Sequence, residues 1–353
     1  MKRLIREFED QVRMEWIDDD NIRIGEVDMN ALGILQRDEK AYEAEYQRWF
    51  NEWLNLRMKR LDNVMGLVPD NRARFTDLGN ALERGVVLPF VGAGMSIASG
   101  MKSWKTFLYE LRTAGTCTEA ELDAFLDANP PDYEAAADLV YNSMTRQLFL
   151  NRMNTRFKLM SSDICGPVCL LPKLFNERVF TTNFDHILEE VYALEGLSFD
   201  FVLRGNEQLD RARQAYNHKS PSLLKLHGDE LASRDRVFTR EEYDRAYSPS
   251  SILRRELGHA VDGTNSLLFL GCSLDADRTM HVLHEVAQRD DGTPEHYAFL
   301  PYDANKHRER ENFLAERGIY PIWYNAPDPT DHDESIEALL VGLLRKMNKL
   351  DAL

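Results

Sequence analysis

Cysteine is scarce in this sequence, which has only four, at positions 117, 165, 169 and 272. Cys165 and Cys169 are separated by three residues, and no second close pair is present to complete a four-cysteine zinc site. We therefore expect no zinc and no other structural metal. The cysteines are better explained as buried free thiols, which suit a reducing cytoplasm.

Long apolar runs are absent as well. The sequence contains no apolar run of about 18 residues, the length that a membrane-spanning helix requires. The N-terminal stretch MKRLIREFEDQVRMEW also lacks the uninterrupted apolar segment of a secretory signal peptide. These absences predict a cytoplasmic protein without a membrane span.

Positive charge is in short supply, since 43 lysines and arginines face 59 aspartates and glutamates, which gives a net charge of −16. A nucleic-acid backbone requires a basic partner surface, so direct nucleic-acid binding is not expected. With 353 residues, of which 43% are hydrophobic, the chain is long enough for one large domain with an appendage or for two domains.

Residues 1–80 differ in pattern from the rest of the chain. An acidic run at Asp18–Asp20 indicates a loose start, and apolar residues at helical spacing then predict a long helix over residues 38–62. A stripe of aromatic residues on this helix packs either onto the main domain or onto a second subunit or partner, and ligand contact is the least expected of the three. We predict burial against a subunit or partner for the stripe, which comprises Tyr42, Tyr46, Phe50 and Trp53.

A glycine-rich turn follows the first strand of the main domain. The apolar run Val86–Val91 ends abruptly in Gly92-Ala93-Gly94, and a helix is expected from Ser103 onward. In α/β folds such a turn brings backbone N–H groups against a dinucleotide pyrophosphate, because glycine has no Cβ to hold the backbone away. A strict dinucleotide fingerprint has a third glycine where this chain has Ile97, so a tight turn without a ligand is the alternative for this stretch alone.

The remainder of the chain alternates between strand-like and helix-like patterns. Helical patterns fill residues 104–175, which predicts an inserted helical subdomain over about residues 115–176. The later alternation predicts an α/β fold with a Rossmann-like, mostly parallel sheet and helices on both faces. The predicted strands are 86–91, 178–182, 199–203, 223–226, 266–270, 297–300 and 320–324, and the predicted helices after the insertion are 184–194, 252–261, 276–288, 304–317 and 334–349.

Polar or small residues stand at four of the strand ends, where ligands of parallel sheets bind. They form the segments GAGMS at 92–96, TTNFD at 181–185, HGD at 227–229 and GCSLD at 271–275. Each segment also has a structural explanation, because Asn183 or Asp185 can cap the following helix and His227 can be an ordinary buried histidine. Gly271 and Ser273 can simply form a tight turn. Four such coincidences at one edge of a sheet are less expected than any one of them.

The ordered set GAGMS, TTNFD, KLHG and GCSLDAD resembles the sirtuin-type NAD-binding fold over roughly residues 84–325. It is most similar to the sirtuin-like NAD hydrolases of bacterial anti-phage defence, whose first loop tends to carry a tryptophan, as GMKSW does here. This resemblance divides the chain into a helical N-terminal extension, residues 1–80, and a sirtuin-like NAD-binding domain, residues 81–353.

The resemblance implies roles for individual residues. Asn183 would orient the ribose and a water molecule, His227 would act as the base, and Asp185 would recognise the nicotinamide amide. Trp104 would cover the nicotinamide end of the site. The remaining residues implied in NAD binding are Gly92, Ala93, Gly94, Ser96, Thr182, Gly271 and Ser273.

The resemblance further implies an NAD⁺ glycohydrolase that releases nicotinamide and ADP-ribose, with NAD as its substrate. It also implies a homo-oligomer and a partner such as a HerA-type translocase ATPase or another phage-sensing protein. A deacylase or ADP-ribosyltransferase at the same site, or a non-catalytic NAD-binding scaffold, are the alternatives. The lack of paired cysteines, and Lys102-Ser103-Trp104-Lys105 where deacylating sirtuins have Pro-Asp-Phe-Arg, argue against deacylation.

Overall fold

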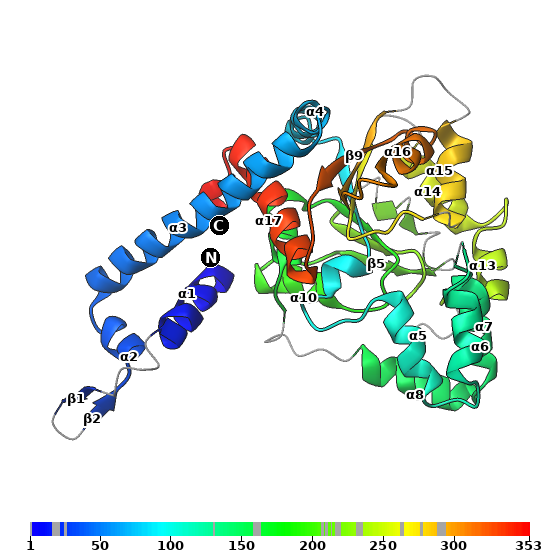
Figure 1. Cartoon of the computed structure of the whole chain (residues 1–353), viewed down its shortest axis with the longest axis horizontal. Coiled ribbons are helices and arrows are strands. Elements are labelled where there is room, and N and C mark those ends of the chain that lie inside the picture. The colour runs from blue at the N-terminus through cyan, green and yellow to red at the C-terminus, as the bar shows by residue number, and fades with distance from the viewer. Residues whose placement is uncertain are drawn as a thin grey trace.

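A computed structural model of the chain shows an α/β body from which an N-terminal arm of helices projects (Figure 1). The structure describes residues 2–15, 22–24, 27–129, 131–157, 164–205, 208, 211–212, 214–215, 220–230, 236–261, 265–275, 278–287 and 294–353. The acidic run Asp18–Asp20 lies outside the described residues.

The body is built on a seven-stranded sheet with the order β5-β6-β4-β3-β7-β8-β9. Every pairing in it is parallel, which confirms the predicted α/β class. The strands are β3 (Val87–Val91), β4 (Arg178–Thr181), β5 (Phe201–Arg204), β6 (Ser222–Lys225), β7 (Ser266–Leu270), β8 (His296–Pro301) and β9 (Ile319–Tyr324).

The strand order reverses between β3 and β7. From β3 the chain moves outward through β4 to β6 on one side, and it returns to β7 on the other side of β3. Apart from β5, which adds an edge strand next to β6, this is the order of dinucleotide-binding α/β sheets. Ligands of such sheets bind beyond the carboxyl ends of the strands at the reversal, which here lies just after Val91 and Leu270.

Alternating residues of each strand face opposite layers, because successive side chains in a strand point to opposite faces. In β3, Val87 and Val91 join one core cluster, while Leu88 and Phe90 join the other. Helices cover both clusters, as predicted. One layer contains α4 (Asn71–Glu83), α10 (Ile187–Leu194) and α17 (Pro329–Lys346), and the other α13 (Arg240–Ala246), α14 (Ile252–Val261), α15 (Arg278–Ala287) and α16 (His307–Ala315).

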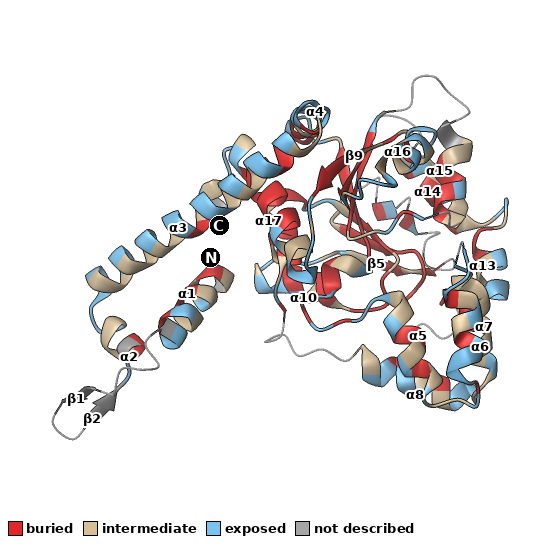
Figure 2. Cartoon of the chain, in the orientation of Figure 1, coloured by how far each residue is buried: buried red, intermediate tan, exposed pale blue. Residues whose placement is uncertain are grey.

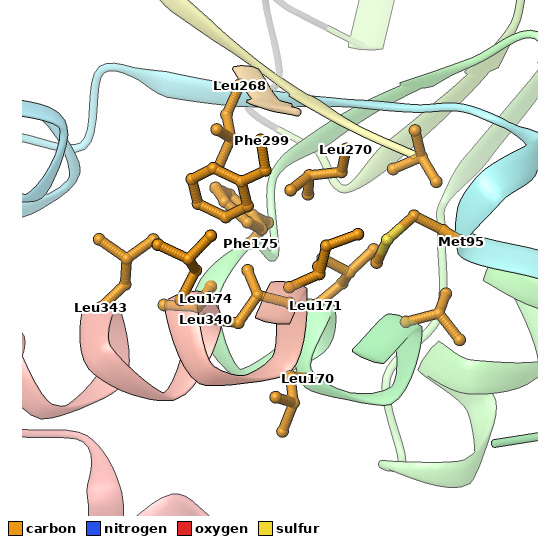
Figure 3. Close-up of a cluster of buried hydrophobic side chains, with 14 of the residues drawn as sticks. Met95, Leu170, Leu171, Leu174, Phe175, Leu268, Leu270, Phe299, Leu340 and Leu343 are labelled. Atoms are coloured by element: carbon orange, nitrogen blue, oxygen red, sulfur yellow. The ribbon is translucent and has the colours of Figure 1, made fainter. Parts of the chain in front are cut away.

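The centre of the first layer is a leucine-rich contact (Figure 3). Leu340 and Leu343 of α17 point toward Leu174 and Phe175, and Leu268 and Phe299 from the sheet lie above them. The sequence predicted one helix over residues 165–175, and this prediction was wrong. The chain instead forms a 3₁₀ turn, Pro167–Leu170, and a single α-turn, α9 (Leu171–Leu174), because Gly166 has a positive φ and Pro172 lacks an N–H donor.

A helical module between β3 and β4 has its own core. It consists of α5 (Trp104–Arg112), α6 (Glu119–Leu126), α7 (Tyr133–Asn142) and α8 (Arg146–Arg156). Buried residues such as Phe107, Leu122 and Phe149 form a separate cluster, to which Phe184 and Phe238 of the body contribute. The helices occupy the part of the chain where the sequence predicted an insertion.

The arm contains α1 (Lys2–Glu15), the hairpin β1 (Ile22–Ile24) and β2 (Val27–Met29), α2 (Ala31–Leu35) and most of α3 (Glu39–Leu67). The predicted loose start was therefore wrong for residues 2–15, because Phe8 and Val12 bury an apolar face on the arm. Helix α3 confirms the predicted long helix. Within the described ranges, no helix combines the length and the apolar character needed to cross a lipid bilayer.

The aromatic stripe packs largely within the chain. Trp53 is 5% exposed and belongs to the main core, whereas Tyr42 and Tyr46 are partly exposed and surround Phe8 of α1. Figure 2 shows α3 grading from exposed and intermediate residues on the arm to buried ones near the body. The structure thus accounts for Trp53 by core packing, one of the two readings of the stripe.

Ion pairs anchor the arm to the body. Glu337 of α17 is 4% exposed and accepts hydrogen bonds from Arg3 of α1 at 2.5 Å and from Arg57 of α3 at 2.6 Å. Burial alone raises the pKa of a carboxyl, but the two guanidinium groups hold the pKa of Glu337 below its usual value. One buried carboxylate therefore joins both arm helices to the last helix of the body.

All four cysteines are free thiols. Their expected burial holds only for Cys117, because Cys169 and Cys272 are half-buried and Cys165 is exposed. Cys165 precedes the Gly166 turn and is exposed between the buried residues Ile164 and Pro167.

Candidate functional site

A cavity of about 500 Å³ lies beyond the carboxyl ends of β3, β4, β6 and β7, under the helical module. This volume is in the range of small-molecule and cofactor sites. The structure brings together nearly all residues that the sequence predicted for the site. Those that line the cavity are Gly92, Ala93, Gly94, Trp104, Thr182, Asn183, Asp185, His227, Gly271 and Ser273.

The glycines at the floor of the cavity let two turns touch. The N–H of Gly94 donates to the carbonyl of Gly271 at 2.9 Å, and the N–H of Gly92 donates to Leu270 at 2.8 Å. A Cβ on Gly94 would lie 2.8 Å from the Cα of Gly271, and Gly271 itself has a φ of +64°. These glycines therefore shape the floor, and the N–H groups of Gly92 and Gly94 are already used inside the protein.

Hydrogen bonds to neighbouring residues fix Asn183, while its side-chain oxygen Oδ1 has no donor among the described residues. Its backbone N–H donates to the hydroxyl of Thr181 at 3.0 Å, and its Nδ2 donates to the hydroxyl of Ser96 at 3.2 Å. The side chain is buried, and Oδ1 has no hydrogen-bond partner among the described residues. A buried acceptor without a donor is costly, so the amide is set to receive a hydrogen bond from a ligand or a water molecule.

Ser96 acts one layer behind the cavity. It is 2% exposed and is not part of the lining, but its hydroxyl fixes the amide of Asn183. Its predicted contact with NAD stays a prediction.

Asp185 combines a structural and a site position. One carboxylate oxygen accepts the N–H of Ile187 at 3.1 Å, which supports the start of α10 as the capping alternative expected. The residue also lines the cavity. Burial raises the pKa of Asp185, although the nearby Lys225 ammonium opposes this shift.

His227 is a buried, neutral histidine. It is 8% exposed, and burial lowers its pKa to about 3, because the charged ring would lose its hydration. Its Nε2 lies 2.8 Å from the hydroxyl of Tyr247, and its ring packs edge-on against Tyr243. At neutral pH this imidazole carries one proton and one lone pair.

A charged network lies behind the loops that follow β4 and β6. His186 bonds the carboxylate of Glu189 through Nδ1 at 3.0 Å and that of Glu230 through Nε2 at 2.6 Å. The fully buried Lys225 donates to the carbonyl of Asp185 at 2.6 Å and to Glu189 at 3.2 Å. The two carboxylates raise the pKa of His186 to about 9, so the ring is an imidazolium at neutral pH.

The network bears on metal binding. His186, Asp229 and Glu230 place ligand-type atoms within 4.8 Å of one another. However, both ring nitrogens of His186 are bonded to carboxylates, and Asp229 is paired with Arg204 of β5. In this arrangement the group is an ion-pair network that connects β5 to the loops after β4 and β6.

The helical module forms the roof of the cavity. Trp104, at the start of α5, packs against Phe184 and Phe238 of the body with ring centroids 6.0 and 5.3 Å away. On the opposite rim, Glu134 of α7 accepts two hydrogen bonds from Arg278 of α15, each 2.7 Å long. Asp132 likewise accepts two from Arg240, at 2.8 and 2.7 Å.

Sequence reasoning missed several residues around His227 and Asp185. Tyr243 lies on α13 and Tyr247 follows its last residue. The sequence did not predict this helix, although Thr239 and Glu242 form a capping box that marks its start. His186 and Lys225 stand within two residues of predicted site residues and carried no signal of their own. Only the fold shows that they meet.

Comparisons with known proteins agree with part of the resemblance. Residues 177–322 match the family model of a SIR2-like domain. TTNFD, KLHG and GCSLDAD lie inside this range, and GAGMS lies before it. The family match therefore supports the resemblance over residues 177–322.

Curated relatives are distant. The NAD(+) hydrolase ThsA of Enterococcus faecium is 24% identical over 234 residues, and that of Cytobacillus dafuensis is 24% identical over 248 residues. The matches cover 65% and 69% of this chain but only 46% and 47% of the relatives, so this chain spans about half their length. A solved structure concerned with the mechanism and regulation of Sir2 enzymes superimposes with a TM-score of 0.40 at 10% identity, covering 78% of this chain and 98% of that one.

Proposed function

We propose that this protein is an NAD⁺ hydrolase that cleaves the nicotinamide–ribose bond and releases nicotinamide and ADP-ribose. The observation that carries the proposal is the unpartnered Oδ1 of buried Asn183, in the same cavity wall as the neutral His227. The SIR2-like match over residues 177–322 and the two distant NAD(+) hydrolases support NAD as the substrate.

The reaction does not require a general acid from the protein. As the bond between the ribose anomeric carbon and the pyridine nitrogen breaks, its electron pair neutralises the positive charge of the nicotinamide. The leaving group therefore needs no proton. Water attacks the anomeric carbon and gives up a proton, so that NAD⁺ and water become nicotinamide, ADP-ribose and H⁺. The protein contributes positioning and exclusion of bulk water.

Asn183 and His227 supply that positioning. The free Oδ1 of Asn183 accepts a hydrogen bond from the ribose or from the water, while its Nδ2 stays fixed on Ser96. His227 presents a lone pair at neutral pH, because its pKa is about 3. A base this weak orients the nucleophile and takes its proton only as the positive charge develops at the ribose.

The carboxyl of Asp185 suits the nicotinamide amide. Buried next to Lys225, it offers an acceptor oxygen to the amide N–H. Trp104 packs at the roof and covers the same end of the cavity.

The experiment that tests the proposal is incubation of the purified protein with NAD⁺ and resolution of the products by mass. We expect nicotinamide and ADP-ribose without any added peptide. Asn183→Ala and His227→Ala should each lower nicotinamide release by ~10²–10⁴-fold with an unchanged circular dichroism spectrum. His281→Ala, on the exposed side of α15, is the matched control and should keep wild-type turnover.

Other outcomes point to other functions. Nicotinamide release that depends strictly on an acyl-lysine peptide, or stoichiometric zinc in the protein, would identify a deacylase. Transfer of ADP-ribose to protein would identify a transferase. A scaffold would bind NAD⁺ without releasing nicotinamide. Both alanine variants would then release as little nicotinamide as the wild type.

The biological setting that we propose is depletion of NAD⁺ in anti-phage defence, on the strength of the motif resemblance. We also propose that the arm contacts a second copy of the chain or a HerA-type ATPase or other sensing partner. Tyr42, Tyr46 and Leu56 support this, because they are partly or largely exposed on α3, with Leu56 at 59%. None of them lines the cavity. Light scattering of the purified chain gives its mass and tests self-assembly.

A further inference from the structure

His227 is one end of a buried chain of hydrogen bonds. Its Nε2 lies 2.8 Å from the hydroxyl of Tyr247, and that hydroxyl lies 2.9 Å from Oγ1 of Thr279. The three residues come from the end of β6, the end of α13 and the start of α15. The chain of hydrogen bonds thus joins three separate elements and begins at Nε2 of the imidazole.

The chain of hydrogen bonds is shielded from solvent. His227 is 8% exposed, Tyr247 6% and Thr279 7%. His227 and Thr279 line the cavity, whereas Tyr247 does not. The Nε2 of His227 is therefore engaged by a residue behind the cavity wall, and bulk water does not compete for it.

We propose that Tyr247 is a positioning residue that fixes the ring and the tautomer of His227, leaving Nδ1 as the nitrogen that receives the proton of the nucleophile. The proposal rests on the proposed NAD⁺ hydrolase function. Tyr247 acts through His227 and does not touch the substrate.

The distances alone allow either direction of donation along the chain of hydrogen bonds, and the proposed base role of His227 selects one. A phenol has one hydrogen to donate, and a neutral imidazole has one N–H and one lone pair. For His227 to accept a proton from the nucleophile, its cavity-side nitrogen must carry the lone pair. Nε2–H then donates to the Tyr247 oxygen, and the Tyr247 hydroxyl donates to Thr279. Nδ1 has no hydrogen-bond partner among the described residues, in keeping with this role.

This is the logic of a catalytic triad with a phenol in the place of the carboxylate. A carboxylate would raise the pKa of the histidine, whereas a neutral phenol adds no opposing charge, and burial lowers the pKa of His227 to about 3. In the reaction, the oxygen–carbon bond to the anomeric carbon forms, the carbon–nitrogen bond to nicotinamide breaks, and the proton of the water moves to Nδ1. Tyr247 continues to accept from Nε2–H throughout.

The test combines kinetics with nitrogen NMR of protein labelled with ¹⁵N at histidine. The variants are Tyr247→Phe and Thr279→Val, and the His227 signals are assigned by their loss in His227→Gln. Tyr192→Phe is the matched control, because it also removes a buried phenol hydroxyl, one that donates to the carbonyl of Phe175 at 2.5 Å. It lies in the core, away from the cavity lining.

We expect the wild-type spectrum to show a protonated Nε2 and an unprotonated Nδ1 for His227. Tyr247→Phe should mix or reverse this pattern and lower kcat about 10- to 100-fold with KM changed less than about twofold, since part of the ~10²–10⁴-fold effect of a placed base is lost. Thr279→Val should shift the same signals by a smaller amount. Tyr192→Phe should leave both the signals and kcat unchanged.

Three results would overturn the proposal. A wild-type ring protonated at Nδ1 would show that the chain runs the other way. Unchanged His227 signals in both Tyr247→Phe and Thr279→Val would make Tyr247 ordinary core. An effect of Tyr192→Phe as large as that of Tyr247→Phe would indicate a loss of stability alone. If the wild type releases no nicotinamide, the proposed function fails, while the spectra still decide the role of Tyr247.

Discussion

A histidine buried without a carboxylate partner loses most of its basicity, and His227 is in this position. The only hydrogen-bond partner of its ring among the described residues is the phenol of Tyr247, and burial lowers its pKa. His186 shows the opposite case, because two carboxylates raise the pKa of its imidazole to about 9. The surroundings of each ring decide its protonation state more than the residue type does.

This assignment predicts the pH profile of the reaction. The ordinary pKa of histidine is about 6.5, but that of His227 is about 3, so kcat/KM for NAD⁺ should show no fall near pH 6.5. We expect a change of less than about threefold from about pH 7.5 to about pH 5.5, measured by nicotinamide release. A single-proton fall centred near pH 6.5 would contradict the assignment.

Stability must be followed in the same experiment. Because the folded pKa of His227 lies below the unfolded value, protons bind preferentially to the unfolded chain as the pH falls below about 6.5. The folded state therefore loses stability between about pH 6.5 and about pH 3, by up to ~1.4 kcal/mol per pH unit. Urea unfolding at each pH separates this loss from a loss of activity.

Sequence reasoning was most informative about which residues gather at the site and least about what each contacts. Asn183, His227 and Asp185 could be placed together because strand ends of a parallel sheet share one edge. Gly92 and Gly94 were interpreted as approach points for phosphate, whereas the structure shows their N–H groups bonded to the β7 turn. A turn-to-turn contact between residues far apart in sequence leaves no local pattern.

Two loops carry the proposed catalytic residues, and the His186 network joins them. Glu189 lies on α10, Glu230 follows β6, and Lys225 and Arg204 face the same network from β6 and β5. The imidazolium of His186 bridges the two carboxylates, which would otherwise repel each other. The network therefore holds the loop of Asn183 in register with the loop of His227.

Replacing His186 by glutamine should alter stability in a defined pH window. The folded pKa of His186 is about 9, above the unfolded value of about 6.5, so its contribution is complete below about pH 6.5 and is lost as the pH rises through about 9. At neutral pH, His186→Gln should lower the free energy of unfolding by about 1.5–3 kcal/mol, the worth of hydrogen bonds to charged groups. Urea unfolding from about pH 6 to about pH 10 measures both proteins.

The wild-type and variant curves should converge at the alkaline end. His281→Gln, at an exposed position of α15, is the control and should run parallel to the wild type. A constant difference between His186→Gln and wild type over the whole range would mean that His186 contributes through packing and not through its charge.

Helices and strands were predicted correctly where the apolar pattern extends over many residues. They were missed where contacts with distant residues stabilise the element. Strand β7 is buried throughout and apolar after Ser266, since both of its faces are covered, and it could be predicted from composition. Helix α13 spans only seven residues, too few for a clear apolar period, and α1 is stabilised mainly by Phe8 against the aromatic residues of α3. Such elements become visible only once their partners are known.

The arm and the body meet at a buried carboxylate. Glu337 receives Arg3 and Arg57, whose side chains are 18% and 22% exposed. On the same helix, Glu334 is 61% exposed and pairs with Arg60 at 3.1 Å. The two positions offer a matched comparison of a buried and an exposed ion pair.

Glu337→Gln should lower the free energy of unfolding by roughly 3 kcal/mol, since it leaves the guanidinium of Arg57 without its counter-charge and that of Arg3 with Glu7 alone. Glu334→Gln should cost less than about 1 kcal/mol. Urea unfolding gives both values, and limited proteolysis should show faster cleavage within α1–α3 for Glu337→Gln alone. Equal effects of the two substitutions would show that burial of Glu337 adds nothing to the anchoring.

The pairing of β3 with β7 also has a consequence for the time at which the site comes into existence. Val87 pairs with Ser266 and Val91 with Leu270, so neighbouring strands at the centre of the sheet come from segments far apart in the sequence. During synthesis the glycine turn and both proposed catalytic residues leave the ribosome before β7 and the turn after it, which form part of the cavity floor. Such non-local pairing also forms slowly. On the proposed function, a chain released before β7 is made would lack part of the cavity floor and should not hydrolyse NAD⁺.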